Sequence, residues 1–138
     1  MGNRRKRGRQ PIIFVVDDDP SVREGLANLI RTTGWRVETF VSATEFLKRG
    51  PPDGPCCLIL DLALPGLSGI DLQRELVSVG RRLPIIFITG HGDIATTVRA
   101  MKTGVVDFLT KPFIGQDLLQ SIKQAIEKDR LEISGGSS

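Results

Sequence analysis

The stretch PIIFVVDDD, residues 11–19, decides the fold class, because an apolar run leads directly into three consecutive aspartates. The apolar residues do not alternate with polar ones, which is typical of a strand that is buried on both faces of a sheet. Asp19 suits the N-cap of a following helix, and Pro20 suits its first position. A buried strand that leads into a helix predicts a parallel α/β sheet, with the aspartates at the strand's carboxyl end.

The same alternation of short apolar runs and helical patterns continues along the chain. Strands are predicted at Pro11–Val16, Arg36–Phe40, Cys56–Leu60, Pro84–Ile88 and Val105–Leu109. Helical spacing marks the segments Val22–Ile30, Ala43–Arg49, Leu72–Val79, Ile94–Met101 and Leu118–Ile126. Gly34 suits the C-cap of the first helix. Strict alternation of strands and helices predicts a doubly wound five-stranded parallel sheet with helices on both faces.

The net charge of +3 is concentrated in a short tail at the start of the 138-residue chain. Five of the 19 basic residues lie within residues 4–9, so the remaining 14 face 16 acidic residues and the body carries about −2. We therefore divide the chain into a basic disordered tail (1–10), one domain (11–130), and a linker stub or frayed C-terminus (131–138). We expect no direct nucleic-acid binding by this segment.

Membrane insertion and export are not expected from this sequence. The apolar runs are far shorter than the roughly 20 residues that a spanning helix needs, and the basic tail lacks the apolar stretch of a signal peptide. The only two cysteines, Cys56 and Cys57, are adjacent in an apolar run, which indicates buried strand residues and no disulfide framework. These features favour a reducing, cytoplasmic location.

Polar residues with chemical potential follow four of the predicted strands. Asp17 and Asp18 follow the first strand, Asp61 the third, Thr89 the fourth and Lys111 the fifth. In a parallel sheet these positions share the carboxyl edge, where open α/β sheets bind ligands. If the first and third strands are neighbours, about 4.8 Å separates them, and two carboxylates at 4 Å repel by about 4 kcal/mol. Either Lys111 or a hard divalent cation such as Mg²⁺ must compensate.

Four motifs together resemble the receiver domain of response regulators from two-component systems. They are VVDDDPSVR, CLILDLALPGLSGIDL, PIIFITGHGD and AMKTGVVDFLTKPF, and the resemblance runs from about Pro11 to Arg130. The wording of the last two motifs is most similar to FixJ-type regulators. The resemblance implies the strand order 2-1-3-4-5 in a flavodoxin-like, or CheY-like, three-layer sandwich.

The resemblance also implies the roles of the acidic residues. Asp61 matches the phosphoacceptor, a carboxylate nucleophile that becomes an aspartyl phosphate. Asp17 and Asp18 match the acidic pair that holds Mg²⁺, together with Asp61 itself. Ala63 matches the position whose backbone carbonyl joins the metal.

Three further positions are assigned by the same resemblance. Thr89 and Lys111 match the pair that binds the phosphoryl oxygens, and Phe108 matches the aromatic switch position. Two residues depart from many receivers or flank the site: Ala63 stands where a polar or basic side chain is common, and His91 follows Thr89 by two residues. The resemblance implies that such positions tune dephosphorylation.

The implied partners are a sensor histidine kinase and an output domain that this chain does not contain. The output domain of FixJ-type regulators is a helix-turn-helix DNA-binding domain, which implies transcriptional regulation. The receiver itself is then a switch and not a turnover enzyme. Phosphorylation is expected to reshape the surface around Ile94, Val98, Met101 and Phe108, either pairing two receivers as a homodimer or releasing the output domain.

Three alternative functions belong to other classes of protein. An aspartate-nucleophile phosphatase of the haloacid-dehalogenase type would use Asp17 as its nucleophile, with Asp19, Thr89 and Lys111 in its motifs. Against it, no acidic pair follows Lys111 at the end of a predicted strand, and the chain is short. A flavodoxin-like cofactor carrier would need a phosphate-binding loop where the aspartates stand. A phosphorylation-independent interaction module would keep the fold and leave Asp61 unmodified.

Overall fold

A five-stranded parallel sheet organises the computed structural model, which describes residues 9–61, 69–81, 83–89, 107–110 and 115–135. The strand order is β2-β1-β3-β4-β5, which confirms the order implied by the family resemblance. The strands are β1 (Ile12–Val16), β2 (Arg36–Phe40), β3 (Cys56–Asp61), β4 (Ile85–Thr89) and β5 (Asp107–Thr110). The helices are α1 (Pro20–Arg31), α2 (Ala43–Lys48), α3 (Gly69–Ser78) and α5 (Gly115–Gly135). The helix predicted around Ile94–Met101 lies outside the described residues.

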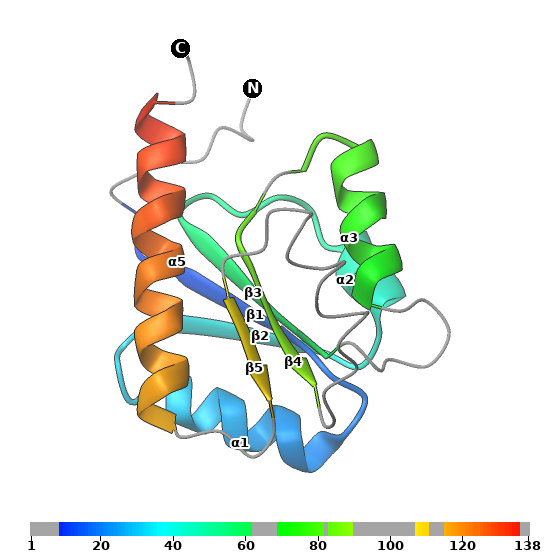
Figure 1. Cartoon of the computed structure of the whole chain (residues 1–138), viewed down its shortest axis with the longest axis vertical. Coiled ribbons are helices and arrows are strands. Elements are labelled where there is room, and N and C mark those ends of the chain that lie inside the picture. The colour runs from blue at the N-terminus through cyan, green and yellow to red at the C-terminus, as the bar shows by residue number, and fades with distance from the viewer. Residues whose placement is uncertain (1–8, 62–68, 82, 90–106, 111–114, 136–138) are drawn as a thin grey trace.

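The helices cover the sheet in two layers, as predicted. Figure 1 shows α1 and α5 on one face and α2 and α3 on the other. Alternate strand residues enter two separate apolar clusters, so that Phe14 packs with α2 and α3 while Val15 packs with α1 and α5. All residues of β1 and β3 are buried. Burial on both faces explains why β1 and the residues of β3 before Asp61 are continuously apolar in sequence.

The start of α1 matches its prediction, and its end differs by two residues. Asp19 is the N-cap, and its side chain accepts a hydrogen bond from the backbone N–H of Ser21. Thr32 caps the other end, where Gly34 was predicted. Gly34 lies beyond the cap with a φ of 86°, a left-handed conformation that glycine adopts without steric strain. The chain turns there and enters β2.

Three phenylalanines and two arginines pack together under α2. Phe46 contacts Phe14 and Phe40 with ring centroids 5.3 Å away in both cases, and both contacts are edge-to-face. The guanidinium of Arg49 lies 5.2 Å from the Phe14 ring centroid, and that of Arg81 lies 5.3 Å from the Phe46 ring centroid. These contacts cover the edge of the apolar cluster with cationic side chains whose charge faces the negative ring surface.

The Arg49–Glu38 ion pair gives one prediction about pH. Two hydrogen bonds of 3.0 and 2.8 Å join the groups, and the hydrogen bond from Arg49 lowers the pKa of Glu38. The pair therefore stabilises the fold above the glutamate's unfolded pKa, and this contribution disappears as pH falls through the lowered folded value. Because the Glu38 side chain is 40% exposed, solvent screening limits the effect of Glu38→Gln to about 0.5–1 kcal/mol near neutral pH.

Urea unfolding at about pH 7 and about pH 2.5 tests this expectation. The difference between Glu38→Gln and the wild type should shrink toward zero in acid. Glu45→Gln, at an exposed site on α2, is the matched control. A difference that stays constant over the whole pH range would show that the charge of Glu38 is not the cause.

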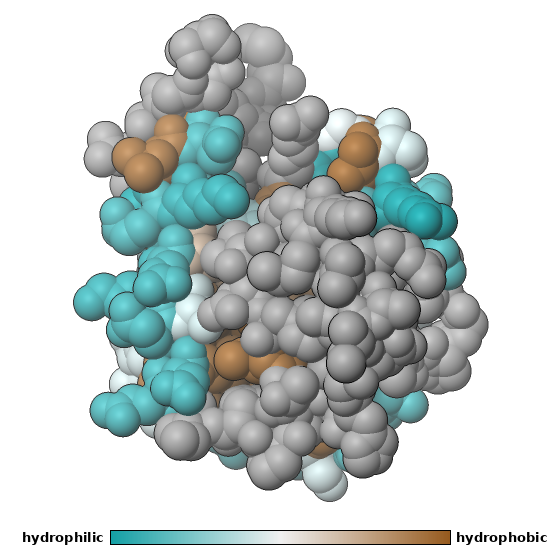
Figure 2. Space-filling model, viewed as in Figure 1, coloured by the Kyte–Doolittle hydropathy of each residue, from teal (hydrophilic) through white to brown (hydrophobic). Residues whose placement is uncertain are grey.

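The last helix is amphipathic and longer than its predicted apolar stripe. Its outward face is hydrophilic along most of its length (Figure 2), and its exposed residues include Asp117, Lys123, Glu127 and Lys128. It continues to Gly135, five residues past the predicted domain end at Arg130, so residues 131–135 extend the helix. The division into domains stays a prediction. No helix in the part of the chain that the structure describes has both the length and the apolar character needed to cross a membrane.

Candidate functional site

The parallel register brings the ends of β1 and β3 together at the carboxyl edge of the sheet. Val16 pairs with Leu60, so Asp17 and Asp61 are the next residues on two adjacent strands. Asp61 is itself the last residue of β3 and pairs with Ile88 of β4. The predicted adjacency of the first and third strands is therefore confirmed, and with it the convergence of their aspartates.

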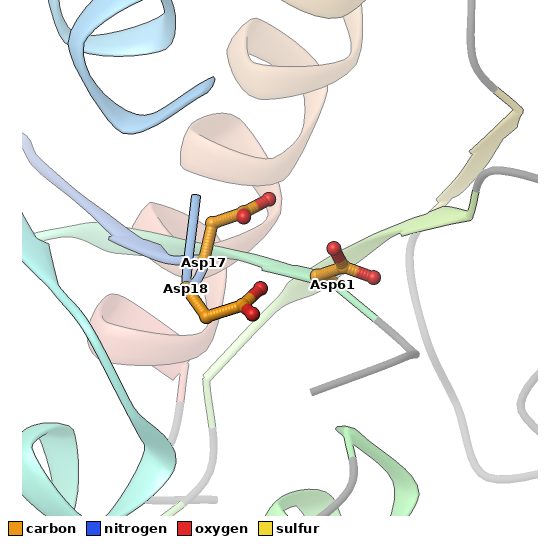
Figure 3. Close-up of side chains that lie close together, drawn as sticks. All are labelled: Asp17, Asp18 and Asp61. Atoms are coloured by element: carbon orange, nitrogen blue, oxygen red, sulfur yellow. The ribbon is translucent and has the colours of Figure 1, made fainter. Parts of the chain in front are cut away.

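Three carboxylates form a cluster at this edge. The side chains of Asp17 and Asp18 extend from the end of β1 toward Asp61 (Figure 3), and one ligand oxygen from each lies within 4.8 Å of the others. Asp17 is 2% exposed and Asp61 8% exposed, whereas Asp18 lies at the surface. The site is thus open on the Asp18 side and closed beneath Asp17.

The third aspartate of the motif has a different role from the first two. The backbone N–H of Asp19 donates a 2.9 Å hydrogen bond to Oδ1 of Asp17, and the side chain of Asp19 caps α1. On the other side, the N–H of Asp17 donates to the carbonyl of Phe40 at 3.2 Å. The turn between β1 and α1 is therefore fixed by contacts that leave Asp19 out of the carboxylate cluster.

The electrostatics of this cluster favour a divalent cation. Two unit charges 4 Å apart repel by about 4 kcal/mol at an effective dielectric of 20, and burial of Asp17 and Asp61 limits screening by solvent. Several carboxylate oxygens beside open solvent make a donor set that suits a hard cation such as Mg²⁺, which keeps part of its water shell. The residues present thus fit a metal of this class.

The other predicted site residues are placed only in part. Thr89 ends β4 and pairs with Thr110 of β5, which confirms its position at the carboxyl edge of the sheet. Phe108 lies on β5 opposite Phe87. The side-chain positions of Thr89 and Phe108 lie outside what the structure describes, as do the residues Ala63, His91, Ile94, Val98, Met101 and Lys111 altogether.

The two cysteines are buried strand residues, as predicted. Cys56 belongs to the apolar cluster under α2 and α3, and Cys57 to the cluster under α1 and α5. Neither cysteine forms a disulfide, and burial raises the pKa of Cys57 well above its usual value. Because adjacent residues of a strand point to opposite faces, the two sulfurs are not placed to form a disulfide with each other.

Arg23 is a residue beside the site that the sequence did not reveal. Its Nη1 atom donates a 2.8 Å hydrogen bond to the backbone carbonyl of Asp17. An arginine in the first turn of a helix is usually solvated. Arg23 is the last residue of the motif VVDDDPSVR, but its spacing from Asp17 does not predict that its side chain turns back to a backbone carbonyl.

The comparisons with known proteins agree with this geometry. The family model "Response regulator receiver domain" matches residues 13–123. Nodulation protein W of Bradyrhizobium diazoefficiens is 53% identical over 130 residues, which are 94% of this chain and 57% of that protein. Transcriptional regulatory protein FixJ of Azorhizobium caulinodans is 40% identical over 114 residues, 83% of this chain and 54% of that protein.

A solved structure gives the same result. The response regulator StyR superposes with a TM-score of 0.87 at 49% identity, covering 94% of this chain and 65% of that one. The chain spans about half the length of the curated relatives it matches. The matches favour the receiver over the phosphatase of the haloacid-dehalogenase type.

Proposed function

Because the chain belongs to the response regulator receiver family, we propose that Asp61 accepts a phosphoryl group from a sensor histidine kinase and that Asp17 and Asp18 hold the Mg²⁺ needed for the transfer. The observation that carries this proposal is the convergence of three carboxylates within 4.8 Å at the end of two adjacent strands. Asp61 ends β3, which is the middle strand of the sheet and lies between β1 and β4.

The chemistry assigned to Asp61 is a nucleophilic displacement at phosphorus. A carboxylate oxygen of Asp61 attacks the phosphorus of a phosphohistidine, the P–N bond breaks, and its electron pair returns to the imidazole, which leaves. Bound Mg²⁺ would supply positive charge to the phosphoryl oxygens. Asp17 and Asp18 contribute by binding and orienting the metal, and the backbone carbonyl of Ala63 is assigned to the same ligand set by resemblance.

The remaining roles rest on the family resemblance and on the strand positions. Thr89, at the end of β4, is assigned to the phosphoryl oxygens together with Lys111. A hydrogen bond from the Thr89 hydroxyl to the new phosphoryl group would draw that side chain inward and give Phe108 on β5 room to turn. This change is the proposed signal on the surface of β5.

The output of the whole protein is proposed to be transcriptional. The relatives are longer than this chain, and FixJ is named a transcriptional regulatory protein. A helix-turn-helix DNA-binding domain is the output type implied by that resemblance, and pairing of two receivers or release of the output domain are the two proposed ways to control it. The family, and the burial of Cys56 and Cys57 without a disulfide, support a cytoplasmic location for this switch.

Phosphorylation with a small phosphodonor tests the assignment. We expect acetyl phosphate and Mg²⁺ to add the mass of one phosphoryl group, located by borohydride reduction and peptide mapping at Asp61. EDTA should stop the reaction. Label at Asp17 would support the phosphatase chemistry instead, and undiminished labelling in EDTA would remove the metal from the mechanism.

A further inference from the structure

Arg23 is joined to the acidic turn at two points. Its backbone N–H donates to the carbonyl of Asp19 at 3.0 Å, which is the first hydrogen bond of α1, and its Nη1 atom donates to the carbonyl of Asp17 at 2.8 Å. The side chain of Arg23 is half-buried. One residue of the helix thus ties both ends of the turn that carries Asp17 and Asp18.

We propose that Arg23 is a positioning residue for the metal site, which sets the direction of the Asp17 and Asp18 carboxylates by holding the backbone between them and α1. This inference rests on the proposed binding of Mg²⁺ by the carboxylate cluster. Arg23 is assigned no contact with the metal or the phosphoryl group. It acts through the carbonyl of Asp17.

The contacts around Asp17 show why this hydrogen bond matters. The backbone N–H of Asp17 is bound to β2 through Phe40, at 3.2 Å, and its Oδ1 atom accepts from the N–H of Asp19 at 2.9 Å. The Arg23 hydrogen bond adds the third direction, from α1. The Asp17 carbonyl belongs to the peptide that joins Asp17 to Asp18, so rotation of this peptide would redirect the Asp18 side chain, which extends toward Asp61 in Figure 3.

A positioning role and a purely electrostatic role of Arg23 predict opposite changes in Mg²⁺ affinity when Arg23 is replaced. A guanidinium beside a cation site repels the incoming cation, so an effect of charge alone would make Mg²⁺ binding tighter after its removal. Loss of positioning would make binding weaker, because the ligand oxygens would no longer converge before the metal arrives. The direction of the change therefore separates the two accounts.

Calorimetric titration with Mg²⁺ alone, without phosphodonor, tests the proposal. We expect Arg23→Met to weaken Mg²⁺ binding about tenfold, as is common when a residue that orients metal ligands is lost. Arg23→Lys keeps the charge but not the planar donor group, and we expect it to weaken binding about threefold. Arg31→Met, at the other end of α1, is the matched control and should bind as the wild type does, because the Arg31 guanidinium donates to Asn28 at 3.3 Å, far along the helix from the acidic turn.

A local readout accompanies the titration. Hydrogen exchange at the Asp19 amide, which donates to Asp17, should become faster in Arg23→Met, while amides of β3 keep their protection. Unchanged or tighter Mg²⁺ binding by Arg23→Met would overturn the proposal, whatever its stability. Should that variant fail to fold, Arg23→Lys decides: weaker binding supports positioning, and wild-type affinity overturns it. Failure of the wild type to bind Mg²⁺ would instead reject the proposed metal site.

Discussion

Replacing Asp61 with asparagine is expected to abolish phosphorylation by acetyl phosphate, whereas Asp19→Asn should leave it intact. An amide oxygen carries no negative charge and is a poor nucleophile, so we expect a loss of about a thousandfold or more in labelling rate. The N-cap of α1 is retained in Asp19→Asn, because asparagine caps helices about as well as aspartate does. Intact-mass spectrometry over a time course measures both variants against the wild type.

The two substitutions are matched in chemistry and differ in place. Both exchange a carboxylate for an amide, and both sites lie at the carboxyl edge of the sheet, but only Asp61 belongs to the cluster of three carboxylates. Circular dichroism should show that each variant is folded, since Asp61→Asn also removes one charge from a crowded site. Label retained by Asp61→Asn, or lost from Asp19→Asn, would contradict the assignment of the phosphoacceptor.

The features of the fold that were predictable from sequence are those that periodicity encodes. The runs Ile12–Val16 and Cys56–Leu60 are buried on both faces, and their continuous apolar character indicates this burial directly. Polar residues directly after such strands must share an edge when the strands are parallel, so the meeting of Asp17 with Asp61 followed from topology. The order of the strands came from the family resemblance, because periodicity does not specify which strands are neighbours.

The contacts that sequence did not show are made by polar side chains that turn inward. Arginine is usually solvated at the protein surface. Here, however, Arg23 contacts a buried carbonyl, and Arg49 and Arg81 each contact an aromatic ring. Long side chains reach such partners through several rotatable bonds, and sequence spacing does not fix the direction. The inward position of Asp129, by contrast, is predictable from the sequence.

Asp129 occupies the next inward position of an otherwise apolar helical stripe. Ile122, Ala125 and Ile126 are buried on α5, and Asp129 follows at the spacing of one further turn. A charged residue at such a position must have a partner to be buried. Asp129 is 2% exposed, and its Oδ2 atom accepts a 2.9 Å hydrogen bond from the backbone N–H of Cys56.

The Asp129 hydrogen bond completes β3 at its first residue. Pairing between β3 and β4 begins at Leu58 with Ile85, so the amide of Cys56 lies before the neighbouring strand starts. The Leu58 N–H donates to Pro84, and the Cys56 N–H, two residues earlier, points to the same side, where α5 supplies the acceptor. The helix thus anchors the amino end of the strand that carries Asp61 at its other end.

Asp129→Ala is therefore expected to destabilise the fold by about 2–3 kcal/mol, because it removes a charged acceptor and leaves a buried amide without this partner. Such a loss is a large part of the 5–15 kcal/mol that is typical of a domain. Asp129→Asn keeps a carbonyl acceptor and should cost about 1 kcal/mol or less. Urea unfolding followed by circular dichroism measures both.

Glu127→Ala provides the surface control on the same helix. Glu127 forms an exposed ion pair with Arg130 at 3.1 Å, and its loss should change stability by about 0.5 kcal/mol or less. If Asp129→Ala were no worse than Glu127→Ala, the buried hydrogen bond would not be what anchors β3. If Asp129→Asn were as harmful as Asp129→Ala, the negative charge, and not the acceptor oxygen, would be the stabilising element. Faster hydrogen exchange at the Cys56 amide in the alanine variant alone would locate the loss at the amino end of β3, far from Asp61 at the opposite end of the same strand.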